Sequence, residues 1–250
     1  MKKNAMLKIA AILMVAVLLT TCAISSTFAK YVSNDEGSDD ARVARWGVKV
    51  DVTADAFADK YINGETKAIS IDGEDIVAPG TAKNDAVKIK ISGKPEVSAK
   101  ISVTDGVVNE TSKLKETQDF IVLDNAEWTI PATSGTEVYC PLVFVVNNQE
   151  YSNVADAEAL ATTVNGAIAQ IVNGWTVTPN QQIGTNDYEL TIGWYWAFDG
   201  NDTKDTLLGN KAAGDATVDP VVDPVDITID FRFDVVVEQT GPAVAGAITK

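Results

Sequence analysis

The sequence predicts an all-β protein, a jelly-roll-like β-sandwich with one inserted amphipathic helix. Short segments of alternating apolar and polar residues recur along the chain and are separated by turns rich in glycine, proline and aspartate, which is typical of sandwiches. One segment, residues 154–171, has helical periodicity instead. Because 46% of the 250 residues are hydrophobic, the chain can bury one core of ordinary size, and we expect one mature domain over residues 43–240.

Residues 1–29 are predicted to be a signal peptide. Three lysines, Lys2, Lys3 and Lys8, accompany an apolar run from Ile9 to Leu19 that suits a signal but is short for a membrane-spanning helix. The motif Thr27-Phe28-Ala29 places small residues at the minus-three and minus-one positions, so we expect cleavage between Ala29 and Lys30. The mature protein is therefore expected to be secreted, and only the uncleaved signal peptide would contact a membrane.

Residues 30–42 are predicted to be an acidic tether and assembly arm. Lys30-Tyr31-Val32 can anchor its extreme end, whereas Ser33 to Asp40 contains four carboxylates and no apolar residue. In Asp39-Asp40 one carboxylate would face a core whichever face of a strand was buried. The tether is thus a poor strand to insert into another subunit.

A strand follows the tether. From Val43 the pattern changes, and the apolar members Trp46, Val48, Val50 and Val52 alternate with polar residues, which predicts a strand with one buried face. Either Ala41–Val52, which contains this strand, or the Lys30–Val32 end can cross between subunits, and the sequence leaves both open. Residues 241–250 are predicted to be a C-terminal tail.

Further strands are predicted in the middle of the chain, at Ile69–Ile71, Val87–Ile91, Val97–Val103, Phe120–Leu123, Trp128–Ile130 and Leu142–Val146. Lys88, Lys90 and Lys100 interleave with apolar residues and mark a solvated face. The run Leu142–Val146 is apolar throughout, which suits a central strand.

The helical segment has an apolar stripe made of Val154, Ala157, Leu160, Ala161, Val164, Ile168 and Ile171. Ser152 or Asn153 is the expected N-cap, and Asp156 and Glu158 lie near the positive end of the helix dipole. The helix is expected to end near Asn173-Gly174 and to pack against the sandwich.

Two strands with clear alternation, Tyr188–Trp196 and Ile227–Val237, end the domain, and a long loop from Asp199 to Asp226 is predicted between them. Trp194 and Trp196 can line a sugar site, although core aromatics are the more common case.

The start of this loop resembles a calcium loop, because Asp199, Asn201, Thr203 and Asp205 fall at alternate positions. Lys204 and Asn210 occupy the expected glycine and glutamate positions, so a solvated turn is the alternative.

Composition excludes several functions. The net charge of −15 becomes −18 once the signal lysines are removed, which disfavours binding to nucleic acid. The chain contains no histidine, so Ser-His-Asp systems and HExxH zinc peptidases are excluded, and we expect no enzyme. Of the two cysteines, Cys22 would leave with the signal, and Cys140 is interpreted as a buried core residue rather than an intermolecular bridge.

The chain resembles the TasA/camelysin family, which is exported through a dedicated signal peptidase. The motifs that carry the resemblance are Thr27-Phe28-Ala29, Val43–Val52, Val77–Thr81, Gly93–Val97, Leu190–Phe198, Gly200–Asp202, Asp205–Gly209 and Val237–Gln239. The resemblance implies a jelly-roll subunit of extracellular biofilm-matrix fibres, whose N-terminal strand completes the sheet of the next subunit. Some relatives are catalogued as metallopeptidases, but this chain has no histidine to hold zinc.

Two functions of different kinds follow. The first is a secreted homopolymeric fibre subunit, processed by signal peptidase and joined by minor fibre or anchoring proteins. The second is a monomeric surface adhesion module that binds a glycan or calcium. A hydrolase that uses a pair of carboxylates is a third and more remote class.

Overall fold

The computed structural model describes residues 43–62, 66–106, 118–184, 187–214 and 223–240. Strands contain 39% and helices 16% of the described residues, so the predicted all-β sandwich with an inserted helix is confirmed. The predicted signal peptide, the tether and the C-terminal tail lie outside the described residues.

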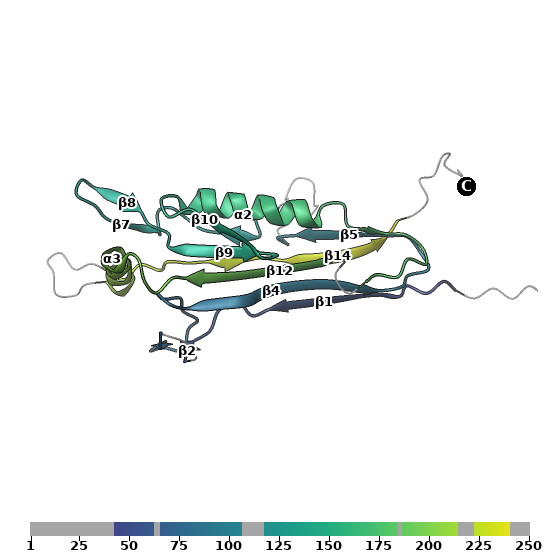
Figure 1. The fold of residues 1–250 in the computed structure, drawn as a ribbon, viewed down its shortest axis with the longest axis horizontal. Coiled ribbons are helices and arrows are strands. Elements are labelled where there is room, and N and C mark those ends of the chain that lie inside the picture. The colour runs from purple at the N-terminus through teal and green to yellow at the C-terminus, as the bar shows by residue number, and fades with distance from the viewer. Residues whose placement is uncertain (1–42, 63–65, 107–117, 185–186, 215–222, 241–250) are drawn as a thin grey trace, which may run out of the picture. The chain divides into compact units, whose positions relative to one another are not determined.

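The larger sheet has five antiparallel strands in the order β1-β4-β12-β9-β10. Their bounds are Val48–Ala54 (β1), Ala82–Gly93 (β4), Glu189–Trp196 (β12), Leu142–Val146 (β9) and Gln149–Ser152 (β10). The strand β12 lies at the centre, between β4 and β9 (Figure 1), so Leu142–Val146 is an interior strand as predicted. The register shifts at Gly193, where an added Cβ would lie 2.4 Å from the Asn84 carbonyl oxygen, so a side chain there would force the strands apart.

The smaller sheet is built around the last strand of the domain. Its strands are β11 (Thr176–Val177), β5 (Ala99–Thr104) and β14 (Asp234–Gln239), in that order. A two-residue strand, β13 (Asp230–Phe231), precedes β14 and pairs with β6 (Ile121–Val122). The predicted start of this strand at Ile227 is wrong, because Thr228 donates its backbone N–H and its hydroxyl to the Glu127 carboxylate instead of to a neighbouring strand.

Two short hairpins complete the β-structure. The strand β2 (Lys60–Tyr61) pairs with β3 (Ala68–Ile69), and β7 (Thr129–Pro131) pairs with β8 (Thr136–Val138).

The helix α2 (Ala157–Val172) is the predicted amphipathic helix, but its N-cap is Asp156 rather than Ser152 or Asn153. The Asp156 carboxylate accepts from the Ala159 N–H, while the Asn125 side-chain oxygen accepts from the N–H groups of Ala157 and Glu158. Ser152 is the last residue of β10 and is therefore unable to cap the helix. The predicted end is confirmed, since Asn173 is the C-cap.

A second helix, α3 (Asp202–Ala213), occupies part of the predicted long loop, so the loop interpretation is wrong over these residues. Only Leu208 is buried, which explains why no apolar stripe indicated the helix. Three hydrogen bonds hold its last turn, because the Lys211 Nζ donates to the carbonyls of Ala126 and Glu127 and to the Thr129 hydroxyl.

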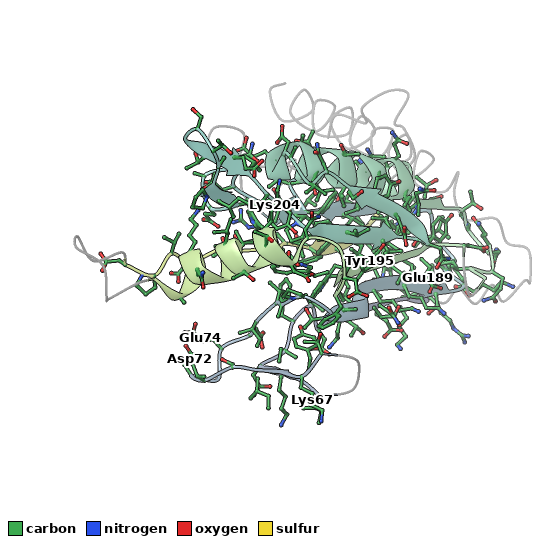
Figure 2. The ribbon with its side chains drawn as sticks, turned by 60° about the vertical axis from the view of Figure 1, so that its left-hand side comes forward. Lys67, Asp72, Glu74, Glu189, Tyr195 and Lys204 are labelled. Carbon is green, nitrogen blue, oxygen red and sulfur yellow. The ribbon has the colours of Figure 1, made fainter. Side chains whose placement is uncertain are left out.

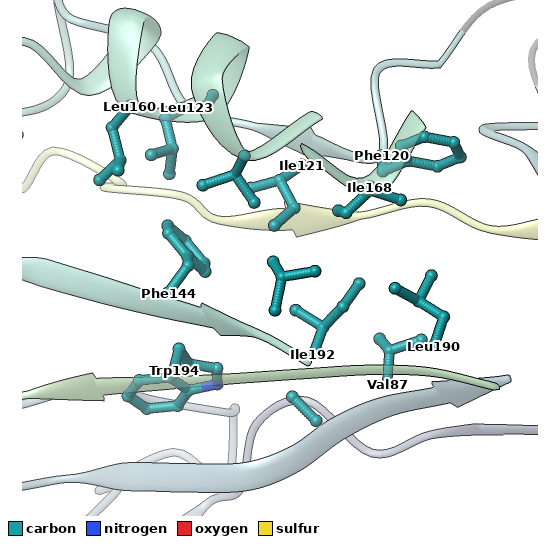
Figure 3. Packing of buried hydrophobic residues seen from close by; sticks show 14 of the residues in the cluster. Val87, Phe120, Ile121, Leu123, Phe144, Leu160, Ile168, Leu190, Ile192 and Trp194 are labelled. Atoms are coloured by element: carbon teal, nitrogen blue, oxygen red, sulfur yellow. The ribbon is translucent and has the colours of Figure 1, made fainter. Parts of the chain in front are cut away.

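The core lies between the two sheets and under α2. Figure 3 shows Leu160 and Ile168 of α2 extending toward Phe144, Leu190 and Ile192 of the larger sheet. Cys140 is fully buried, and burial raises the pKa of its thiol to about 12, as expected for a structural rather than a reactive cysteine.

The prediction that the strand after the tether buries one face is wrong. The strand β1 begins at Val48, and its apolar residues remain open to solvent: Val50 is 37% and Val52 is 46% exposed. Trp46 and Val43, which precede it, are 39% and 90% exposed. The strand pairs along its whole length with β4, and Val48 packs on the core, but within the described residues Val50 and Val52 are left largely uncovered.

Candidate functional site

The outer edge of the β13–β14 strand has unpaired backbone groups. The Arg232 N–H donates to the Phe120 carbonyl on the β6 side, and the Thr240 N–H donates to the Ser98 carbonyl on the β5 side. Because alternate residues of a strand direct their backbone groups to the same edge, the odd-numbered residues from Phe231 to Gln239 face outward. Their outward groups have no partner among the described residues. The apolar ones are Phe231, Phe233, Val235 and Val237. We call these four residues the open edge.

Apolar side chains lie beneath the open edge. All four are only half-buried, although they pack on the core. Phe233 stacks on Phe120 at a centroid distance of 5.1 Å, and Phe231 contacts Phe144 of β9 at 6.0 Å. This strand therefore forms the rim of the core rather than its interior.

The larger sheet also leaves apolar side chains uncovered, at its edge strand β1. Val50 and Val52 are paired with Ile91 and Ile89 in the β1–β4 ladder. Directly opposed residues project from the same face of a sheet, so the two valines point to the inner face, as the buried isoleucines do. Their exposure means that β1 extends beyond the cover that the smaller sheet provides.

The open edge and β1 lie on the same side of the sandwich. Phe57, which follows β1, contacts both Trp194 of β12 and Phe231 of β13, each at a centroid distance of 5.5 Å. On the other side, α2 contacts β9 and β10 of the larger sheet, β5 of the smaller sheet, and β6, the partner of β13. One more strand beside β14 would thus cover Val50 and Val52 and pair with the open edge.

Other sheet edges are less suited to an added strand. The outer edge of β10 belongs to Gln149–Ser152, which is mostly polar and exposed. The strand β1 carries Lys49 and Asp51 on its outer face, and charges of this kind discourage edge-to-edge pairing.

A hollow of about 570 Å³ lies at the start of the open edge and includes Ile229 and Asp230 in its lining. Its floor contains Trp128 and Trp196, and its walls are residues 74–77, the α3 residues Leu208, Gly209 and Ala212, and residues 225–230. Figure 2 shows Glu74 on the segment that carries β2 and β3, below α3 in that view. We call this hollow the terminal hollow.

Lys211 positions the α3 wall of the terminal hollow through its three hydrogen bonds to the β7 region. Burial lowers the pKa of its ammonium group. At the other end of α3, the Asp205 carboxylate accepts from the Tyr139 hydroxyl at 2.5 Å and from the Trp196 indole N–H at 3.2 Å. Two causes raise the pKa of the Tyr139 hydroxyl: burial, which is the larger, and the neighbouring Asp205 carboxylate.

The predicted calcium ligands are only partly brought together. Asp199 and Asp205 line a second hollow of about 300 Å³, but Asn201 is not part of its lining. Asp205 is already engaged by Tyr139 and Trp196. Within the described part of the chain, no group of three or more acidic, cysteine or histidine residues could hold a metal ion. A calcium site here stays a prediction.

The predicted assembly residues fall into two groups. Thr27, Phe28, Ala29, Lys30, Tyr31 and Val32 lie outside the described residues. Val43, Trp46 and Val48 are described, and Val48 pairs with Gly93 of the same chain. The sequence did not reveal the open edge or the terminal hollow, because both depend on which strands become neighbours.

Comparison of the chain with family models, with curated proteins and with solved structures finds no match. No helix among the described residues is both long and apolar enough to cross a membrane.

Proposed function

We propose that this chain is a secreted structural subunit of extracellular fibres, in a biofilm matrix or at the cell surface, and that it polymerises by strand addition. The observation that carries the proposal is the open edge above half-buried apolar side chains, facing the uncovered valines of β1. A strand from a second copy would satisfy the outward backbone groups and cover apolar surface in one step.

The N-terminal arm is the proposed donor. The segment Val48–Ala54 already pairs with β4 of its own chain over seven residues, which favours the part before Val48 as the segment that crosses. Each backbone hydrogen bond contributes about 0.5–1.5 kcal/mol, so a few residues of pairing plus covered apolar surface suffice for a reversible contact. The export motif and the resemblance to the TasA/camelysin family are consistent with this role.

The rival proposal, a monomeric adhesion module, rests on the terminal hollow, because a hollow lined by both carboxylates and apolar residues also suits a glycan. The two functions differ in oligomeric state. Filaments of the mature protein, residues 30–250, are expected in electron micrographs under the first proposal only.

The open edge is tested with Val237→Pro and its matched control Val237→Ala. Proline removes the outward N–H, which no described residue uses, and proline is tolerated where a strand's N–H faces solvent. Alanine removes side-chain atoms but keeps the N–H. We expect Val237→Pro to remain folded and monomeric by light scattering while Val237→Ala still forms filaments. Equal assembly of the two variants would contradict the proposed edge.

A further inference from the structure

We propose that the terminal hollow binds the processed amino terminus of a second copy, Lys30-Tyr31-Val32. The inference rests on the proposed function, because it assigns a binding site to the end of the arm. It adds a chemical reason for assembly to follow cleavage: the α-amino group of Lys30 exists only after the signal peptide has been removed.

The size and lining of the terminal hollow suit a short segment with an aromatic side chain. About 570 Å³ falls within the range of pockets that enclose small ligands. Trp128, Trp196 and Leu208 are almost completely buried beneath it, so the open apolar surface comes from Ile227 and Ile229, which are half-buried in its wall. Tyr31 and Val32 supply apolar groups that would cover this surface.

The rim is negatively charged. Four carboxylates line the hollow, from Glu74, Asp75, Asp226 and Asp230. Asp230 pairs with Arg232 at 2.7 Å, but within the described ranges no lysine or arginine forms an ion pair with the other three. After cleavage, Lys30 carries both an α-ammonium and a side-chain ammonium group. The two ammonium groups of Lys30 would therefore be attracted to the three rim carboxylates that have no ion-pair partner among the described residues.

The hollow is continuous with the open edge. Ile229 and Asp230 line it, and Phe231 is the first residue of the edge. An end bound in the hollow therefore holds the rest of the arm beside β13 and β14. Residues 33–42 are too acidic to insert as a strand, but as a solvated tether these ten residues can extend at most about 36 Å and link the bound end to Val43 of the donor subunit.

Charge disfavours the nearest occupant from the same chain. Residues 215–222 lie next to the hollow in sequence, but they include Asp215 and Asp219 and no cation. Like charges repel, so this segment is a poorer match for the rim than Lys30-Tyr31-Val32.

The test uses the mature chain with Lys30-Tyr31-Val32 replaced by Gly-Ser-Gly, which leaves the described residues unchanged. A peptide of residues 30–35 with a free amino terminus and a C-terminal dye is titrated with this protein, and its fluorescence anisotropy is measured. We expect saturable binding that weakens with salt and falls at least about tenfold when the peptide is both acetylated and changed by Lys30→Glu.

Protein variants locate the site. Asp75→Asn with Asp226→Asn is expected to weaken peptide binding at least about tenfold, whereas Glu150→Gln with Glu238→Gln, exposed carboxylates outside the hollow, should leave it unchanged. Equal binding of the modified peptide, or no effect of the first pair, would overturn the inference. Displacement of the peptide by a neutral hexasaccharide, or by a peptide of residues 215–222, would assign the hollow to that occupant instead.

Filament formation by the unmodified mature protein is followed in parallel. Filaments without peptide binding would refute the proposed role of the terminal hollow but remain consistent with the proposed fibre function. Peptide binding without filaments would refute the fibre function and leave the binding site standing.

Discussion

Val50 and Ile91 face each other across the β1–β4 ladder and project from the same side of the sheet, yet Ile91 is fully buried and Val50 is 37% exposed. The smaller sheet ends at β14, and among the described residues nothing buries Val50 as Ile91 is buried. This pair marks the boundary between the core of one chain and the surface that we propose a second chain covers.

Val52→Lys is therefore expected to affect assembly far more than stability. The side chain is already 46% exposed, so a lysine there should change the free energy of unfolding by no more than about 0.5 kcal/mol. A charge on the inner face would nevertheless oppose an added strand. Urea denaturation and filament yield are measured on the same preparation.

The matched control is Thr53→Lys, one residue along the same strand and on its opposite face. It should leave both stability and filament yield unchanged. In contrast, Ile89→Ala, paired with Val52 but fully buried, should cost about 2–5 kcal/mol. Loss of filaments in the Thr53 variant as well would show that charge alone, and not the inner face, is responsible.

Asn165 joins α2 to β6, and its loss should strongly destabilise the fold. Its side-chain oxygen accepts from the Ile121 N–H at 2.8 Å, and its amide group donates to the Ile121 carbonyl at 2.9 Å. Ile121 is buried, so Asn165→Ala would leave two buried backbone groups without partners, at about 1–3 kcal/mol each. Urea denaturation should show a loss of about 2–5 kcal/mol.

Thr163→Ala on the exposed side of α2 serves as the control, because the Thr163 hydroxyl bonds only within the helix, to the Ala159 carbonyl. We expect a change within about 0.5 kcal/mol. Similar losses in the two variants would mean that the link to Ile121 does not determine the result, since alanine favours the helix at both positions.

Local periodicity predicted those parts of the fold that depend on nearby residues. The strand Leu142–Val146 and the helix ending at Asn173 follow from patterns within one segment. The Asp156 cap was missed because the Asn125 side chain, distant in sequence, helps to satisfy the same helix end. The second helix was missed because its packing depends on one buried leucine and on Lys211, whose partners lie more than eighty residues away.

The candidate site was less accessible to sequence reasoning. Alternation at Val48, Val50 and Val52 correctly indicated a strand with one apolar face, but it could not show that nothing in the same chain covers that face. Asn165 offered one signal, a polar residue within the apolar stripe of a helix, which often indicates a specific buried hydrogen bond.

Asp156 should make stability depend on pH in the acid range. Its carboxylate accepts from the Ala159 N–H and from the Asn125 side chain, and these hydrogen bonds lower its pKa. A carboxyl group whose pKa is lower in the folded state stabilises the fold at any pH above its pKa in the unfolded chain, about 3.9. This stabilisation is lost as the pH falls through the pKa of the folded state. Asp156→Asn should therefore be less stable than the unmodified protein at pH 7, and the difference should shrink towards pH 3.

Urea midpoints at pH 7, 5 and 3 measure this trend. The control Glu238→Gln removes one negative charge from an exposed position on β14 that caps no helix. A difference between Asp156→Asn and the unmodified protein that stays constant over this range would contradict the assignment of the cap.

Cys140 should report global unfolding rather than surface chemistry. Its side chain is fully buried, and burial raises the pKa of the thiol to about 12. At pH 8 only about one such thiol in ten thousand would be ionised even if it were reachable, compared with about a quarter of ordinary cysteines.

In the mature protein, which lacks Cys22, a disulfide reagent should react slowly under native conditions and at once in concentrated guanidinium. The native rate should rise in destabilised Asn165→Ala and stay unchanged in Thr163→Ala, since reaction then requires opening of the core. Rapid labelling of the folded protein, or covalent dimers in filaments that disappear on reduction, would show that Cys140 is accessible and would favour the intermolecular bridge that its burial argues against.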